Sequence, residues 1–163
     1  MRTQAYAPMI FAAVVLIVCS FGLDQPSSAQ STDDCMKVKG RLIQDSSSGR
    51  NLGTIMNGGI LNGRTEIVFD TAAFPTPDPT TVSFIGDLTV TTHRGVLKTH
   101  DVYLFDFSKA VGTGIHRIDP DASTGIFAGA IGILYDNSQS TGPSTIQGAV
   151  TGAICFGGDD RRH

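Results

Sequence analysis

Residues 82–107 read VSFIGDLTVTTHRGVLKTHDVYLFDF, and this stretch decides the fold class. Apolar and polar side chains alternate along its first part, so that Phe84 and Leu88 share one face of a predicted strand. Residues 93–95 (His-Arg-Gly) form a tight turn, and residues 96–107 return as the antiparallel partner strand. The stretch therefore predicts a long β-hairpin.

Similar short segments lie on both sides of this hairpin, separated by turn-forming residues. No window of the sequence has a sustained helical periodicity. The prolines within residues 74–80 predict an extended loop without ladder hydrogen bonds. The predicted strands cover residues 36–43, 51–56, 60–70, 82–92, 96–107, 114–118, 127–135 and 145–156.

About eight strands that are joined as sequence neighbours predict an all-β chain, built as one antiparallel barrel or sandwich. A closed eight-stranded barrel is favoured because closure removes the exposed strand edges of an open sheet. Glycines within the predicted strands, such as Gly86 and Gly148, suit the bends and close backbone approaches of a small barrel.

The composition argues against several other classes of protein. A single Glu beside 19 glycines argues against a helical bundle. A formal net charge of −3, with no basic block, argues against nucleic-acid binding. An apolar content of 40% is too high for a disordered chain.

The N-terminus has the pattern of a secretory signal peptide. Residues 10–18 read IFAAVVLIV, Arg2 precedes them, and residues 27–29 (Ser-Ser-Ala) supply a cleavage site. We therefore expect a signal peptide over residues 1–29 and one domain over residues 30–163, ending in a short flexible tail. No second apolar run follows, so the secreted chain, extracellular or periplasmic, is expected to have no membrane partner.

Three cysteines bear on the compartment. A lipoprotein would use Cys19 as its lipidated residue, but the preceding Val18 is bulky where such a site needs a small residue. Cys35 and Cys155 remain after cleavage, and an even pair in an exported protein predicts a disulfide. First and last strands can be neighbours in a closed barrel, which agrees with this pairing. Two free buried thiols are the alternative, and export disfavours a nucleophilic cysteine.

Residues 123–135, STGIFAGAIGILY, contain the most distinctive motif. They resemble the (G)TG-x-F-x-x-A-x-G strand signature of the allene oxide cyclase and dirigent-like barrel superfamily. The resemblance extends over roughly residues 37–156, but only the 123–135 segment is specific. It implies an eight-stranded antiparallel barrel, calycin-like in shape, with a cavity and often trimeric. Plant dirigent proteins are also exported and link an early cysteine to a late one.

The motif also has a purely structural interpretation. Gly125 can supply a positive φ before a strand, and Phe127 can fill the barrel. Gly129 and Gly132 can let neighbouring chains approach closely. The motif therefore indicates a fold and does not locate the chemistry.

The resemblance implies binding of a small apolar or aromatic molecule, whose cyclisation or stereoselective coupling the protein steers. Such catalysis rests on shape, exclusion of water and one or two polar groups. No cofactor or covalent nucleophile is implied. No metal is expected, because His93, His100 and His116 lack short metal-ligand spacing. A noncatalytic ligand carrier, or a structural extracellular or cell-surface protein, is the alternative, and a homo-oligomer (trimer or dimer) is compatible with both.

Glu66, His100 and Tyr103 are the candidate catalytic residues. Glu66 is the only Glu of the chain and lies within a predicted strand, where burial would raise its pKa and suit it to acid or base chemistry. An outward Glu66, paired with a neighbouring Arg or Lys, is the alternative. His100 and Tyr103 lie on opposite faces of one predicted strand, and either could donate a hydrogen bond to a ligand oxygen. Arg117 and Tyr135 are the candidate ligand-binding residues, and a structural role is the alternative for each.

Overall fold

The structure, a computed structural model, describes residues 35–48, 50–70 and 73–157. The predicted signal peptide, its cleavage site and most of the predicted tail lie outside these residues. The strands are β1 (Cys35–Asp45), β2 (Asn51–Met56), β3 (Gly63–Phe69), β4 (Phe74–Pro75), β5 (Thr81–Thr92), β6 (Gly95–Asp106), β7 (Val111–Ile118), β8 (Ile131–Ser140) and β9 (Thr145–Cys155). Two 3₁₀ helices, η2 (Gly59–Leu61) and η3 (Gly125–Phe127), lie in connections.

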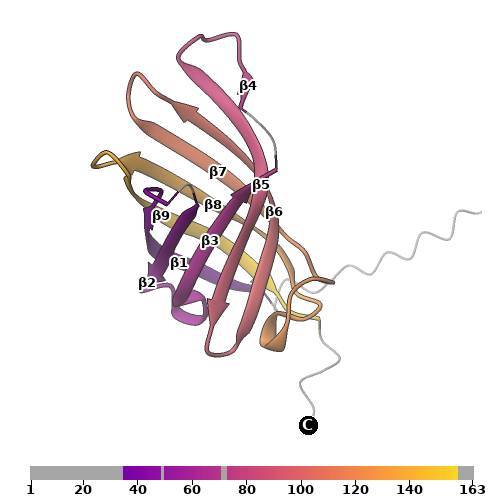
Figure 1. Cartoon of the computed structure of the whole chain (residues 1–163). Helices are drawn as coiled ribbons and strands as arrows, with labels where there is room; N and C mark the ends of the chain where they lie inside the picture. Colours follow the sequence, from indigo (N-terminus) through magenta and orange to yellow (C-terminus); the bar gives the residue numbers. More distant parts are fainter. Residues whose placement is uncertain (1–34, 49, 71–72, 158–163) are drawn as a thin grey trace, which may run out of the picture.

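The strands form one closed antiparallel barrel (Figure 1). Their order in the sheet is β3-β2-β1-β9-β8-β7-β6-β5-β4, and β3 also pairs with β5, which closes the ring. Eight strands make up the barrel, and the two-residue β4 is added to β5 outside the ring. The predicted eight-stranded antiparallel barrel is therefore confirmed.

Several local predictions were wrong. The strand predicted over residues 60–70 begins only at Gly63, because η2 precedes it. The strand predicted over residues 127–135 begins only at Ile131, because η3 and a turn with Gly129 at φ 69° precede it. That strand continues to Ser140, so residues 136–140 belong to β8 and not to a loop. The predicted proline loop contains β4, because Pro75 sits outside the ring, where a missing N–H is tolerated.

The inward-facing side chains of the strands pack tightly at one end of the barrel. This end carries η2, η3 and the turn between β5 and β6 (Figure 1). Phe127 of η3 is 0% exposed, which agrees with its expected role of filling the barrel. It packs in a cluster of buried aliphatic side chains that includes Val90, Leu97 and Ile154. The opposite end of the lumen is not filled in this way, and it holds the cavity described below.

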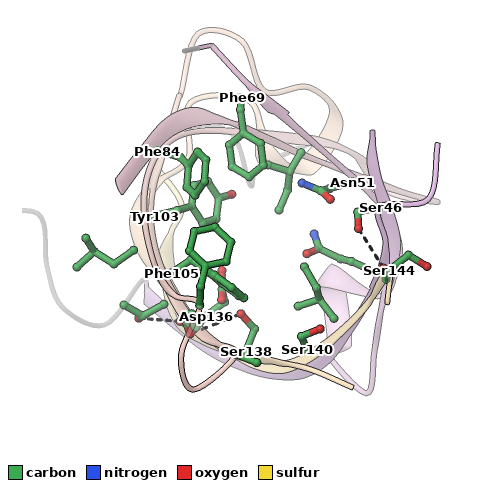
Figure 2. Close-up of a pocket in the computed structure, with 18 of the residues that line it drawn as sticks. Ser46, Asn51, Phe69, Phe84, Tyr103, Phe105, Asp136, Ser138, Ser140 and Ser144 are labelled. Carbon is green, nitrogen blue, oxygen red and sulfur yellow. Dashed lines mark hydrogen bonds between the residues drawn. The ribbon is translucent and has the colours of Figure 1, made fainter. Parts of the chain in front are cut away.

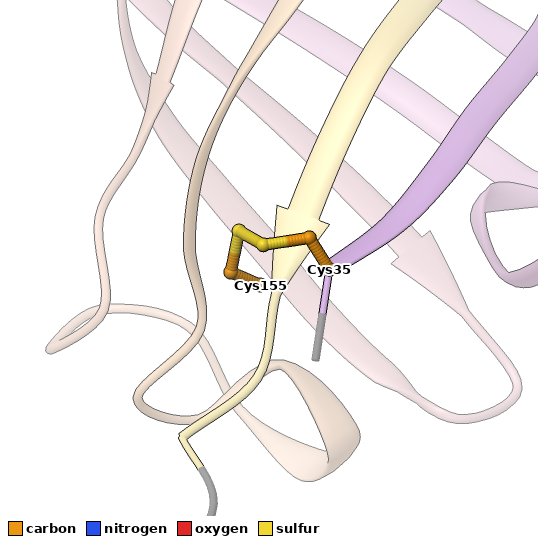
Figure 3. Close-up of a disulfide and its surroundings, with 2 residues drawn as sticks. All are labelled: Cys35 and Cys155. Carbon is orange, nitrogen blue, oxygen red and sulfur yellow. A yellow bond between two sulfur atoms is a disulfide. The ribbon is translucent and has the colours of Figure 1, made fainter. Parts of the chain in front are cut away.

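Cys35 and Cys155 form the predicted disulfide (Figure 3). The two residues are directly opposite each other in the pairing of β1 with β9. Their Cα atoms are 3.9 Å apart, which is shorter than the usual range of about 4.4–6.8 Å and does not exceed the limit of about 7 Å for a bridge. A structural disulfide indicates an oxidising compartment.

Replacing both Cys35 and Cys155 with Ser should lower the free energy of unfolding by about 2–5 kcal/mol, because the bridge closes a loop of 120 residues in the unfolded chain. The barrel should still form, since β1 and β9 remain paired over their whole length. Urea unfolding of the two proteins measures the difference. Equal unfolding midpoints would contradict a stabilising bridge.

Candidate functional site

A cavity of about 430 Å³ occupies the other end of the lumen. It lies where the turns after β1, β6 and β8 meet, since residues from each of these turns line it. Aromatic side chains form one wall: Phe69, Phe84, Tyr103 and Phe105 (Figure 2). Small polar side chains form the facing wall: Ser46, Asn51, Ser138, Ser140 and Ser144. The cavity is thus apolar on one side and able to form hydrogen bonds on the other.

The aromatic wall follows from strand alternation and register. Phe84 of β5 and Tyr103 of β6 are directly opposite each other, and both point inward. Phe69, at the end of β3, lies with its ring centroid 4.9 Å from that of Phe84 and 5.3 Å from that of Tyr103. These tilted and edge-on contacts are the arrangements that aromatic rings prefer. They hold the rings in place as one continuous apolar surface.

A buried ionic cluster lies beneath this wall. His116 of β7 has its Nδ1 atom 3.1 Å from Asp101 Oδ1 and its Nε2 atom 2.9 Å from Asp136 Oδ2. All three side chains are buried. Because ionised carboxylates only accept hydrogen bonds, this arrangement places a proton on each ring nitrogen and makes His116 an imidazolium.

The pKa of His116 agrees with this geometry. Burial opposes the charged ring, but the hydrogen bonds and negative charges of Asp101 and Asp136 outweigh it and raise the pKa of His116 to about 9. Tyr103 donates a hydrogen bond of 2.6 Å to Asp101 Oδ2. Burial, followed by the negative charge of Asp101, raises the pKa of Tyr103 far above its ordinary value, so its hydroxyl stays neutral.

Gly114 of β7 makes room for this cluster. A Cβ atom at this position would lie 2.8 Å from Tyr103 Cε1 and 2.9 Å from His116 Nε2, and it would collide with Asp136 Oδ2. Real Cβ atoms do not approach other atoms so closely. The glycine is thus required by the packing of the cluster and not by its backbone conformation, since its φ is not positive.

The cavity contains one of the three candidate catalytic residues. Tyr103 lies in the aromatic wall. Glu66 lies between the inward-facing Thr65 and Ile67, so its side chain points outward, where it forms an ion pair with Arg50. This is the outward alternative considered from the sequence.

The other candidates also lie on the outer surface. His100 is exposed, with its Nδ1 atom 2.8 Å from Asp87 and its Nε2 atom 3.2 Å from Asp119. Arg117 is exposed on β7, and Tyr135 is exposed on β8. Neither lines the cavity. The structure thus does not bring the five candidates together.

Sequence reasoning missed Asp101, His116 and Asp136. Asp101 lies on the same face of β6 as Tyr103, so its inward position could have been inferred from the alternation of that strand. His116 was considered only as a metal ligand. Asp136 was assigned to a loop, because the predicted strand stopped at Tyr135. If the predicted strand had continued beyond Tyr135, alternation would have placed Asp136 on the same face as the buried Leu134.

No group of three or more His, Cys, Asp or Glu residues suited to a metal ion occurs within the described part of the chain. Within the same residues, no helix is both long enough and apolar enough to cross a bilayer. No known protein-family model and no curated protein sequence matches this chain. The comparisons therefore identify no family, and the structure establishes the eight-stranded barrel.

The two histidines that lie between aspartates offer a matched pair of variants. His116→Gln should lower the free energy of unfolding by about 3–5 kcal/mol, because it leaves two buried carboxylates without their cation. His100→Gln should cost less than about 1 kcal/mol, because its partners are solvated. Chemical denaturation of both variants at pH 6 tests this, and equal losses would contradict a charged, buried cluster.

The same cluster predicts how stability depends on pH. The pKa of His116 is about 9 in the folded chain against an ordinary value of 6.5, so its contribution is complete below pH 6.5 and is lost as the pH rises through 9. The free energy of unfolding of the wild type should therefore fall across this range. His100→Gln should retain most of the fall and His116→Gln should lack it. A flat profile for the wild type would contradict the prediction.

Proposed function

We propose that this chain is a secreted barrel that binds a small, largely apolar or aromatic molecule in the cavity. The observation that carries this proposal is a cavity of about 430 Å³ with an aromatic wall, a polar wall and a buried ionic cluster. Ligand pockets have volumes of about 300–1,000 Å³ and combine apolar walls with a few converging polar groups.

We further propose that binding steers the cyclisation or stereoselective coupling of that molecule. The aromatic wall would fix the orientation of the ligand and exclude water from one face. Asp136 lines the cavity. Its carboxylate would stabilise positive charge that develops on the ligand or accept a proton that leaves it. The resemblance of residues 123–135 to allene oxide cyclases and dirigent-like barrels supports this kind of chemistry.

A noncatalytic carrier is the second candidate, and it needs the same cavity. A purely structural barrel is less well supported, because small barrels of that kind fill their interior with side chains. Chiral analysis of products from phenolic and polyene substrates separates turnover from carriage. A product ratio that the protein changes supports steering, whereas binding with an unchanged ratio supports a carrier.

The binding itself is tested with 2-naphthol, a fluorescent aromatic alcohol of suitable size. Ser138 lines the cavity, whereas the neighbouring Gln139 is exposed on the outer face. Ser138→Trp should fill the cavity and weaken 2-naphthol binding by about tenfold or more, because it removes the space for the ligand. Gln139→Trp adds the same side chain outside and should leave the affinity unchanged. No binding by the wild type would overturn the proposal.

We also propose that the chain forms a homo-oligomer through its outer face. Ile85, Val102, Ile115 and Tyr135 are directly opposite one another across β5, β6, β7 and β8, and all are exposed. A continuous apolar surface of this kind is typical of a protein interface. In the oligomer, this surface would be buried against the corresponding surface of a second copy of the chain.

Val102→Asp places a charge in the middle of that row. It should shift the mass measured by light scattering to that of a single chain, because an unpaired charge would be buried in the interface. Lys98→Asp is a suitable control, since Lys98 is exposed on β6 outside the row. A monomeric wild type would contradict the proposed assembly.

A further inference from the structure

With both of its carboxylates ionised, the ionic cluster would carry an excess negative charge. Asp101 and Asp136 supply two carboxylates, and His116 supplies one cation between them. None of the described residues that line the cavity is Lys or Arg. An interior of low polarity screens charge poorly, so the remaining negative charge acts strongly on whatever enters the cavity.

The two carboxylates differ in how many donors they meet. Asp101 accepts hydrogen bonds from Thr99 at 2.6 Å and from Tyr103 at 2.6 Å, in addition to its contact with His116. The carboxylate of Asp136 meets only His116, through Oδ2. No described residue donates to Asp136 Oδ1. Because Asp136 lines the cavity and Asp101 does not, this oxygen is the acceptor that a ligand can reach.

A second polar group of the cavity also lacks a partner. Gln44 lines the cavity and is 4% exposed, and its Nε2 atom has no hydrogen-bond partner within the described residues. Buried polar side chains nearly always have a partner, and the exceptions require an explanation. Because this Nε2 atom is a donor, it could only be satisfied by an acceptor atom on a ligand and not by an ammonium group.

We propose that the ligand of this cavity is a protonated amine on an aromatic or apolar body, with its ammonium group on Asp136 Oδ1. This inference rests on the proposed function, because it names the class of ligand for the same cavity. The ammonium group donates to the one free carboxylate oxygen and offsets the excess negative charge. The rings of Phe84 and Phe105 lie in the adjoining wall, where aromatic faces attract cations. A carboxylate ligand would be repelled by the carboxylate of Asp136.

Three compounds of equal length test the charge preference: 3-phenylpropan-1-amine, 3-phenylpropan-1-ol and 3-phenylpropanoate. Each is titrated into the wild-type protein at pH 7, with displacement of 2-naphthol as evidence for the same site. The amine should bind at least about tenfold more tightly than the alcohol, because a hydrogen bond to a charged group is stronger than one between neutral groups. The carboxylate should bind more weakly than either.

Asp136→Asn should weaken amine binding by about tenfold or more and alcohol binding by less than about threefold. Asp87→Asn, which removes a carboxylate from the outer surface beside His100, should leave all three affinities unchanged. Asp136 is buried beside His116, and its replacement also affects stability. The wild-type series therefore stands on its own as a test.

The outcomes separate this inference from the function on which it rests. If 2-naphthol binds but the amine has no advantage over the alcohol, the amine proposal is overturned and ligand binding stands. If neither 2-naphthol nor any of the three compounds binds, both proposals are overturned. A preference for the carboxylate would also overturn the amine proposal, because it requires a cation that the cavity wall does not supply.

Discussion

The pairing of β3 with β5 is the constraint on which the rest of the structure depends. Without it the sheet would have two open edges and no enclosed lumen. Glycines at both ends of the pairing allow the close approach: a Cβ on Gly63 would collide with the carbonyl of Thr91, and one on Gly86 with the carbonyl of Val68. The same register places Phe69 opposite Gly86 and brings its ring against Phe84. The strand register that closes the barrel therefore also places the rings of the aromatic wall.

The closed barrel divides its interior into two parts with different physical roles. Aliphatic side chains and Phe127 fill one end and supply the hydrophobic stabilisation of the fold. The other end remains open, and the cluster of Asp101, His116 and Asp136 lies beneath its aromatic wall. A buried ionic cluster contributes less to stability than apolar packing of the same volume. Its position beside the cavity is therefore what the proposed ligand binding would use.

The sequence predicted the features that depend on local periodicity. Alternation identified the hairpin of β5 and β6, and the even number of cysteines after cleavage predicted the bridge between Cys35 and Cys155. The ionic cluster was only partly predictable, because it forms from three strands whose register is set by contacts distant in sequence. Tyr103 was found as a polar residue among apolar ones on a single strand. His116 and Asp136 become recognisable only when β7 and β8 are aligned with β6.

His100 and His116 show why residue type alone could not locate the site. Each has both ring nitrogens beside the carboxylates of two aspartates, and the two residues lie on neighbouring strands. Strand parity points His100 outward and His116 into the lumen. Around His100, water screens the charges, so its contacts with Asp87 and Asp119 contribute little to stability. Around His116, no water is available, so the protein itself must balance the charges. The face of the strand that bears a charge therefore decides whether water or protein surrounds it, and the closed sheet fixes that face.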